Sequence, residues 1–190
     1  PYFRTREARQ VLTAHGIEMI LPPDELLQAD LPVLAPQVAG AIRKTDDLTI
    51  LDVGGDHVGA RILSALADAF RYLDQSVYII QVINHFRPNT ATVGGCLRMR
   101  AAIEAAARMP VRGWAGNSHL MDETTIEHIG QGYAFLKQLS AETSLPLKFI
   151  TVSQELLPGA AALNLECPLL TIRRQLVPPW KKPADLGRSF

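Results

Sequence analysis

The feature that most constrains this chain is a regular alternation of short apolar runs with longer amphipathic stretches. Apolar runs rich in β-branched residues predict buried strands, and apolar residues at every third or fourth position predict helices. Strands and helices that alternate in this way form an α/β fold with a mainly parallel sheet, because parallel strands need crossover connections. Since such crossovers are right-handed, we expect helices on both faces of the sheet.

The predicted elements follow one another without an internal repeat or a low-complexity linker. Strands are expected at residues 17–21, 48–53, 77–83, 111–115 and 147–152, with an edge strand at residues 169–172. Helices are expected at about residues 3–15, 36–44, 58–73, 90–108 and 124–143. A chain of 190 residues favours one domain, which we place at residues 1–178, followed by a C-terminal tail at residues 179–190.

Composition excludes several classes of protein. Nineteen basic and nineteen acidic residues give zero formal net charge, which is not the basic character of a nucleic-acid-binding protein. No apolar stretch approaches the roughly 18 residues that span a bilayer, and prolines interrupt the C-terminal residues, so no stable membrane anchor is predicted. The two cysteines form neither a disulfide framework nor a zinc motif. We therefore expect a globular, cytoplasmic protein.

Polar residues that follow buried strands are the candidates for chemistry, because ligands of parallel sheets bind at the carboxyl ends of the strands. Asp52, Gly54 and Gly55 come at the end of one predicted strand. A carboxylate there suits Mg²⁺, and glycines let the backbone approach a phosphate closely. The alternative is that Asp52 caps the following helix and that the glycines only form a tight turn.

Two further predicted strands lead into polar loops, at residues 84–87 and at residues 117–119. The side chain of Asn117 offers both a hydrogen-bond donor and an acceptor, which suits the edge of a purine base. The alternative is a turn in which Asn117 bonds its own backbone.

Other catalytic motifs are weak or missing. The histidines at positions 57, 85, 119 and 128 lack the spacing of a zinc motif, which favours ordinary loop or helix histidines over a metal cluster. Ser118 does not lie in the Gly-x-Ser-x-Gly motif of hydrolases. The sequence contains neither a Walker A loop, Gly-x-x-x-x-Gly-Lys-[Ser/Thr], nor Gly-x-Gly-x-x-Gly.

Taken together, these segments resemble the MinD/ParA-type branch of P-loop NTPases, also labelled CobQ/CobB/MinD/ParA nucleotide-binding domains. Residues 51–56 are similar to the Walker B and switch region of the family, and residues 82–88 to the segment after the next strand. Residues 116–120 are similar to the strand end that carries an adenine-facing Asn, and residues 1–8 to a stretch found in one bacterial group of the family. The similarity covers residues 1–170.

The resemblance implies that the protein binds ATP and Mg²⁺, hydrolyses ATP, and switches between a monomer and a nucleotide-bridged homodimer. Asp52 would position Mg²⁺, the backbone N–H of Gly54 or Gly55 would contact the γ-phosphate, and Asn117 would contact the base.

The sequence departs from the family at one point. The family carries its Walker A loop on the first strand-loop-helix unit, and that unit is absent from these residues. We therefore expect a P-loop NTPase-like fragment that is inactive alone and whose full-length form is the ATPase. The alternative is a non-catalytic α/β binding or interaction module derived from the same fold. A flavodoxin-like domain is a third interpretation, but it would need a phosphate loop that residues 22–24 do not supply.

Overall fold

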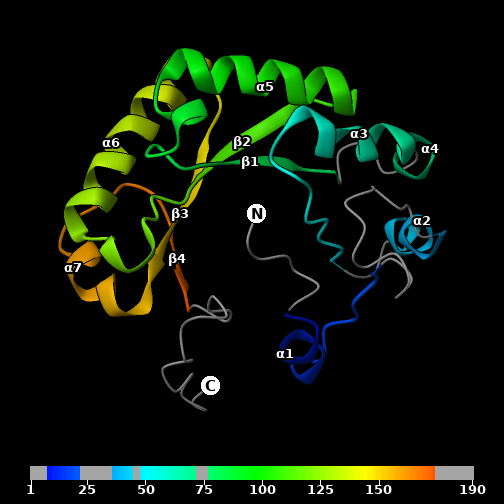
Figure 1. Ribbon diagram of the computed structural model, residues 1–190, viewed down its shortest axis with the longest axis horizontal. Coiled ribbons are helices and arrows are strands. Elements are labelled where there is room, and N and C mark those ends of the chain that lie inside the picture. The colour runs from blue at the N-terminus through cyan, green and yellow to red at the C-terminus, as the bar shows by residue number, and fades with distance from the viewer. Residues whose placement is uncertain (1–7, 22–35, 45–47, 72–76, 174–190) are drawn as a thin grey trace. The chain divides into compact units, whose positions relative to one another are not determined.

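The structure is a computed structural model that describes residues 8–21, 36–44, 48–71 and 77–173 (Figure 1). The chain divides into two compact units, Pro1–Asp52 with Arg173–Phe190, and Val53–Ile172. The single domain at residues 1–178 stays a prediction, and the predicted tail lies outside the described residues.

The second unit contains a four-stranded parallel sheet, which confirms the α/β class predicted from the alternating pattern. Its strands are β1 (Ile79–Ile83), β2 (Val111–Gly116), β3 (Leu147–Ser153) and β4 (Leu169–Ile172). They lie side by side in the order in which they occur in the chain. All four were predicted: the boundaries of β4 are as expected, and those of the other three differ by one or two residues at one end.

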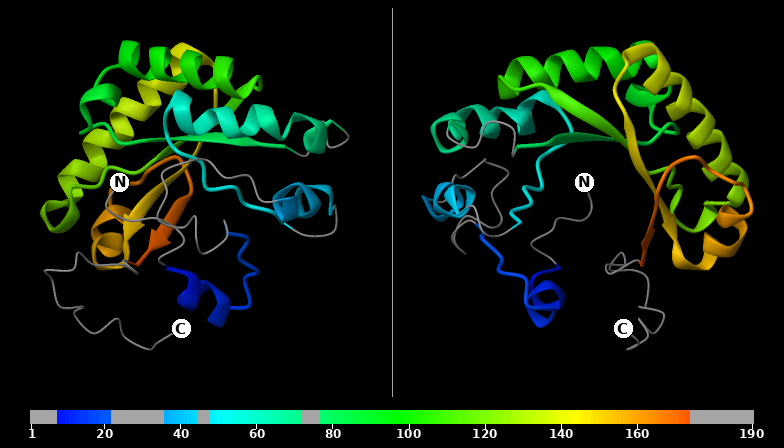
Figure 2. Two further views of the ribbon diagram at one scale, coloured as in Figure 1. Left: turned by 45° about the vertical axis from the view of Figure 1, so that its right-hand side comes forward. Right: turned by 180° about the vertical axis from the view of Figure 1, so that it is seen from behind.

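Helices α5 (Val93–Ala107), α6 (Ile126–Thr143) and α7 (Leu157–Ala161) connect successive strands and lie along one side of the sheet (Figures 1 and 2). Right-handed crossovers between strands in sequential order place successive helices on the same face. Helices on both faces are therefore not found within the described part of this unit. The short α7 was not predicted.

Within the described part of the second unit, two helices precede β1, namely α3 (His57–Ala65) and α4 (Ala67–Phe70), and α3 packs against α5. One continuous helix was predicted here, but the structure interrupts it at Leu66. Short 3₁₀ helices follow the carboxyl ends of β1, β2 and β3: η4 (Pro88–Thr90), η5 (Met121–Glu123) and η6 (Gln154–Leu156).

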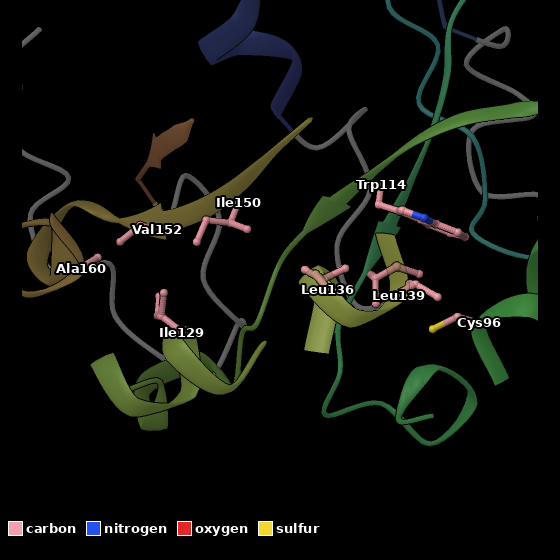
Figure 3. Close-up of a cluster of buried hydrophobic side chains, with 9 residues drawn as sticks. Cys96, Trp114, Ile129, Leu136, Leu139, Ile150, Val152 and Ala160 are labelled. Atoms are coloured by element: carbon pink, nitrogen blue, oxygen red, sulfur yellow. The ribbon is translucent and has the colours of Figure 1, made fainter. Parts of the chain in front are cut away.

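The core of the second unit lies between the sheet and the helices (Figure 3). Leu136 and Leu139 of α6 project toward the strands, beside Trp114 of β2. The indole N–H of Trp114 is buried and donates a hydrogen bond to Thr143 Oγ1 at 3.0 Å. This bond satisfies the one polar group of a side chain that is otherwise surrounded by apolar atoms.

The face of β1 that points away from the helices is exposed. Gln81 and Ile83 are buried, whereas Ile80 and Val82 are 37% and 59% exposed. The sequence had indicated a strand covered on both faces, because its β-branched residues run continuously. That interpretation is wrong for β1 in this structure.

In the first unit the structure describes α1 (Arg9–Ala14) and α2 (Pro36–Arg43). Helix α1 ends before Gly16, whose φ of 75° lies in the left-handed region that glycine adopts most easily. The first residues of the helix predicted at residues 3–15 lie outside the described residues.

The strands predicted at residues 17–21 and 48–53 are wrong, since the structure assigns no strand to either segment. Leu48 and Ile50 are 88% and 80% exposed. Apolar, β-branched residues favour an extended backbone, but a strand forms only when a neighbour accepts its ladder hydrogen bonds. Neither segment has such a neighbour among the described residues.

Both cysteines are free thiols, and their environments predict different reactivity. Cys96 is fully buried, and burial raises the pKa of its thiol from 9.0 to about 11. Burial also raises the pKa of Cys167, which is half-buried. At pH 8 we expect a disulfide reagent to label Cys167 slowly and Cys96 only after unfolding in urea, because the thiolate is the reactive form. Labelling of Cys96 in the native protein as fast as in urea would contradict this expectation.

The Cys96 thiol also links stability to pH. The native protein holds this proton more tightly than the unfolded chain does, because the pKa is raised. The contribution of Cys96 to the free energy of unfolding is therefore fully present below pH 9.0 and is lost as the pH rises through about 11. In urea titrations the difference in stability between the wild type and Cys96→Ala should be constant from pH 7 to about pH 9 and should shrink as the pH rises further toward 11.

Candidate functional site

The carboxyl ends of β1, β2 and β3 lie at one edge of the sheet, because the strands are parallel. Asn84 is the first residue after β1, and Asn117 is the first residue after β2. The backbone N–H of Asn117 donates to the carbonyl of Ile83 at 2.8 Å, which continues the ladder to the start of both loops. Two of the predicted polar loops are thus adjacent.

Asn84 ties these two loops together. Its Nδ2 donates to the carbonyl of His119 at 2.9 Å, and its Oδ1 accepts from the N–H of Phe86 at 3.0 Å. Its carbonyl accepts from the hydroxyl of Thr90 at 2.6 Å. Each end of the Asn84 amide therefore makes a hydrogen bond within the protein, so this side chain joins the two loops at the edge of the sheet.

We expect Asn84→Ala to lower the free energy of unfolding by about 1–3 kcal/mol, since it removes two side-chain hydrogen bonds and leaves partly buried partners unpaired. The matched control is Asn89→Ala in the same loop, an exposed position that we expect to change stability by less than about 0.5 kcal/mol. Urea unfolding followed by circular dichroism measures both. Equal effects of the two substitutions would show that Asn84 does not join the loops in solution.

Asn117 is oriented by a residue from the next strand. Thr151 Oγ1 on β3 lies 2.8 Å from Asn117 Oδ1 and 3.2 Å from the carbonyl oxygen of Gly116. The turn interpretation, in which Asn117 bonds its own backbone, is wrong, because its amide oxygen accepts from Thr151. Asn117 as a residue is half-buried.

Ser118 lies against helix α6. It is 8% exposed, and a Cβ added to Gly132 would overlap Ser118 Oγ and lie 2.8 Å from its Cβ. Only a glycine at position 132 lets the helix come this close. This buried position agrees with the sequence argument against Ser118 as a hydrolase nucleophile.

His85 and His128 both contact the ring of Phe86, at centroid distances of 5.2 and 5.1 Å. His85 stacks on the ring of Phe135 at a centroid distance of 4.4 Å, and His57 is the first residue of α3. His128 Nδ1 accepts from the N–H of Thr125 at 3.1 Å, and the Thr125 hydroxyl accepts from the N–H of His128, which is a capping box for α6. Among the described residues, no three His, Cys, Asp or Glu side chains are grouped so that they could hold a metal ion.

Asp52 is the last residue of the first unit, and its side chain is exposed. Gly54 and Gly55 follow Val53 at the start of the second unit and lead into α3. The N-cap of α3 is Asp56, whose Oδ1 accepts from the N–H of Gly59 at 2.8 Å. The interpretation that Asp52 caps this helix is therefore wrong. The chain bends at residues 55–56, and Gly54 packs closely against Gly59, where an added Cβ would lie 2.6 Å from Gly54 Cα.

The roles of two residues of this region, Asp56 and Thr151, were not predicted from the sequence. Asp56 had a recognisable signal, since an Asp directly before a helical apolar period is a typical N-cap. Thr151 had only a faint one, a hydroxyl within an otherwise apolar strand. Its partner lies 34 residues away, and no local pattern shows such a pairing.

Comparison of the chain with protein-family models, curated proteins and solved structures finds no match in any of the three. Among the residues that the structure describes, none belongs to a helix with the length and apolar character needed to cross a bilayer.

Proposed function

We propose that this chain belongs to an ATP-binding and ATP-hydrolysing switch protein of the MinD/ParA type, which acts as a homodimer. In this proposal the adenine base binds at the carboxyl ends of β1 and β2, which we call the base-binding edge. The observation that carries the proposal is the half-buried Asn117 amide at the carboxyl end of β2, held by Thr151. Parallel sheets bind ligands at this edge, and an Asn amide can pair with both the amino group and the ring nitrogen of adenine.

In this proposal Asp52 holds Mg²⁺, and the backbone N–H of Gly54 or Gly55 contacts the γ-phosphate. Proteins that bind nucleotides commonly hold Mg²⁺ with one or two carboxylates together with phosphate oxygens and water. The exposed Asp52 carboxylate fits that donor set. Mg²⁺ would supply positive charge to the phosphates. The Lys of a Walker A loop is not among these 190 residues.

Adenosine tests the base-binding edge without depending on phosphate contacts. We expect adenosine to bind with a dissociation constant on the order of 0.1–1 mM, typical of a small ligand held by a few contacts. In a ¹⁵N NMR titration the side-chain amide of Asn117 and the backbone N–H groups of neighbouring residues should shift. Asn117→Ala should abolish the shifts of those neighbours, whereas Asn89→Ala should keep them. If adenosine and ATP at several millimolar leave these signals unchanged in the wild type, the proposal is wrong.

The magnesium site has its own prediction. We expect Mg²⁺ to strengthen ATP binding to the wild type and to have no such effect on Asp52→Asn, because the substitution removes the carboxylate. Calorimetric titrations of each protein with ATP, in Mg²⁺ and in EDTA, give the ratio of the two ATP affinities. Asp68→Asn is the control, since Asp68 is an exposed carboxylate on α4 that pairs with Arg71. A Mg²⁺ effect that survives Asp52→Asn would show that Asp52 does not hold the ion.

A second candidate is the non-catalytic interaction module. Ile80 and Val82 on β1 and Leu170 on β4 expose apolar surface on the sheet, as docking surfaces often do. This function would be favoured if neither adenosine nor ATP binds.

A further inference from the structure

Strand β1 is an edge of the sheet, and among the described residues it pairs only with β2. The carbonyl of Ile83 accepts from the N–H of Asn117 on the β2 side, so the backbone groups of Ile83 and of Gln81 point toward β2. Because successive residues of a strand turn their backbone groups to opposite sides, those of Ile80 and Val82 point to the free side. Natural edge strands commonly avoid further pairing with charged residues or proline, and β1 contains neither.

Gln81, at the centre of β1, has a buried amide with an unused acceptor. The residue is 7% exposed, and its Oε1 accepts no hydrogen bond from any of the described residues. Leaving a buried amide oxygen without a donor costs about 1–3 kcal/mol, so such atoms are rare in folded proteins. A donor brought to the free side of β1 would remove this cost.

The sequence of β1, Ile-Ile-Gln-Val-Ile, reads almost the same in both directions about Gln81. Two copies paired antiparallel around a two-fold axis at Gln81 place Ile80 of each opposite the partner's Val82. Since the outward backbone groups belong to Ile80 and Val82, these residues form the hydrogen-bonded pairs, and the two Gln81 residues form a non-hydrogen-bonded pair. The backbone geometry and the symmetry of the sequence therefore select the same register.

We propose that β1 is a homodimerisation edge, at which two copies of this chain join their four-stranded sheets into one continuous sheet. Residues of a non-hydrogen-bonded pair have Cα atoms about 4.5 Å apart, so after a turn of the terminal torsion Nε2 of Gln81 donates to Oε1 of the partner's Gln81. On the other face the partner covers part of Ile80 and Val82, which are 37% and 59% exposed. A two-fold interface needs a self-complementary patch, which favours a second copy over an unrelated strand. Nucleotide takes no part, so the proposal is independent of the proposed function.

The first test is sedimentation equilibrium of the full chain without nucleotide. Pairing of two short strands buries less than a standard interface, so we expect a dissociation constant on the order of 1–100 μM. Val82→Pro removes the outward N–H that bonds the partner's Ile80 and keeps the ladder to β2, so it should weaken the dimer at least about tenfold. Val82→Ala keeps this N–H and is the matched control, which should stay within a few-fold of the wild type.

The second test reads the register and does not depend on the folding of the Pro variant. In a Cys167→Ala background the remaining native thiol, Cys96, is buried. Oxidation with diamide should link two copies of Gln81→Cys, because their Cα atoms would be about 4.5 Å apart. Ile80→Cys should not link, since two residues of offset separate these Cα atoms by about 8 Å.

Each result decides the proposal. A wild type that stays monomeric without nucleotide overturns it and leaves the ATP-binding proposal untouched. A dimer that survives Val82→Pro, or one in which Gln81→Cys forms no disulfide, uses another surface and also overturns it. A dimer that is lost in a folded Val82→Pro variant, or that is linked through Gln81→Cys and not through Ile80→Cys, supports it.

Discussion

Gly132→Ala is expected to lower the free energy of unfolding by about 3 kcal/mol, one of the largest effects of any substitution in the chain. The added methyl group would overlap Ser118 Oγ and lie 2.8 Å from Ser118 Cβ, and both residues are buried. The sign of this change in the free energy of unfolding is informative, because helix propensity alone favours Ala over Gly by about 1 kcal/mol. Here the steric overlap outweighs that preference.

Gly130→Ala is the matched control in the same helix. The nearest atom to a Cβ at position 130 is Leu163 Cδ1 at 3.7 Å, an ordinary contact distance. We expect this substitution to stabilise the protein by about 0.5–1 kcal/mol through helix propensity alone. Ser118→Gly should restore part of the stability of Gly132→Ala, since it removes both atoms that the methyl group meets. Urea unfolding of the single and double variants measures this coupling, and additive effects would contradict the packing.

Trp114→Ala should destabilise the protein by about 3–5 kcal/mol, the usual range for a large buried side chain. Trp114 is fully buried in the core of the second unit, and its substitution also leaves the hydroxyl of Thr143 without the indole donor. Thr143→Val separates the two contributions, because it removes the hydrogen bond and preserves most of the packing. We expect it to account for about 1 kcal/mol.

Leu97→Ala provides the control for Trp114, as Leu97 is an apolar residue of α5 with 40% of its surface exposed. Leu97→Ala should lower the free energy of unfolding by less than about 1 kcal/mol, because Leu97 buries less apolar surface than Trp114 does. Thermal or urea unfolding measures the change in the free energy of unfolding for each variant. A loss for Trp114→Ala as small as that for Leu97→Ala would mean that the core shown in Figure 3 is not formed in solution.

The fold of the second unit follows closely from local patterns. Residues 79–83 and 147–153 are apolar runs bounded by polar loops, and the amphipathic stretch at residues 126–143 lies between β2 and β3. The same reasoning failed for residues 17–21 and 48–53, which have equally apolar sequences. The composition of a segment shows that it can enter a sheet, but the presence of a neighbouring strand decides whether it does.

The candidate site could be located in part. The positions of Asn84 and Asn117 follow from the rule that parallel strands present their carboxyl ends at one edge. The hydrogen-bond partners of the two side-chain amides do not follow from this rule. Asn84 bonds to His119 and Asn117 to Thr151, which lie 35 and 34 residues away. Such partners become visible only when the register of the strands is known.

The sequential strand order also bears on how the second unit assembles during synthesis. Each of β2, β3 and β4 pairs with the strand made just before it, so none of these three waits for a later segment to appear. Pairings such as that of Ile79 with Val111 still close over a whole helix, and parallel sheets of this kind fold more slowly than chains with mainly local contacts. We expect β1, α5 and β2 to form a folding nucleus while the ribosome is still adding β4, with each later helix and strand docking onto an edge that already exists.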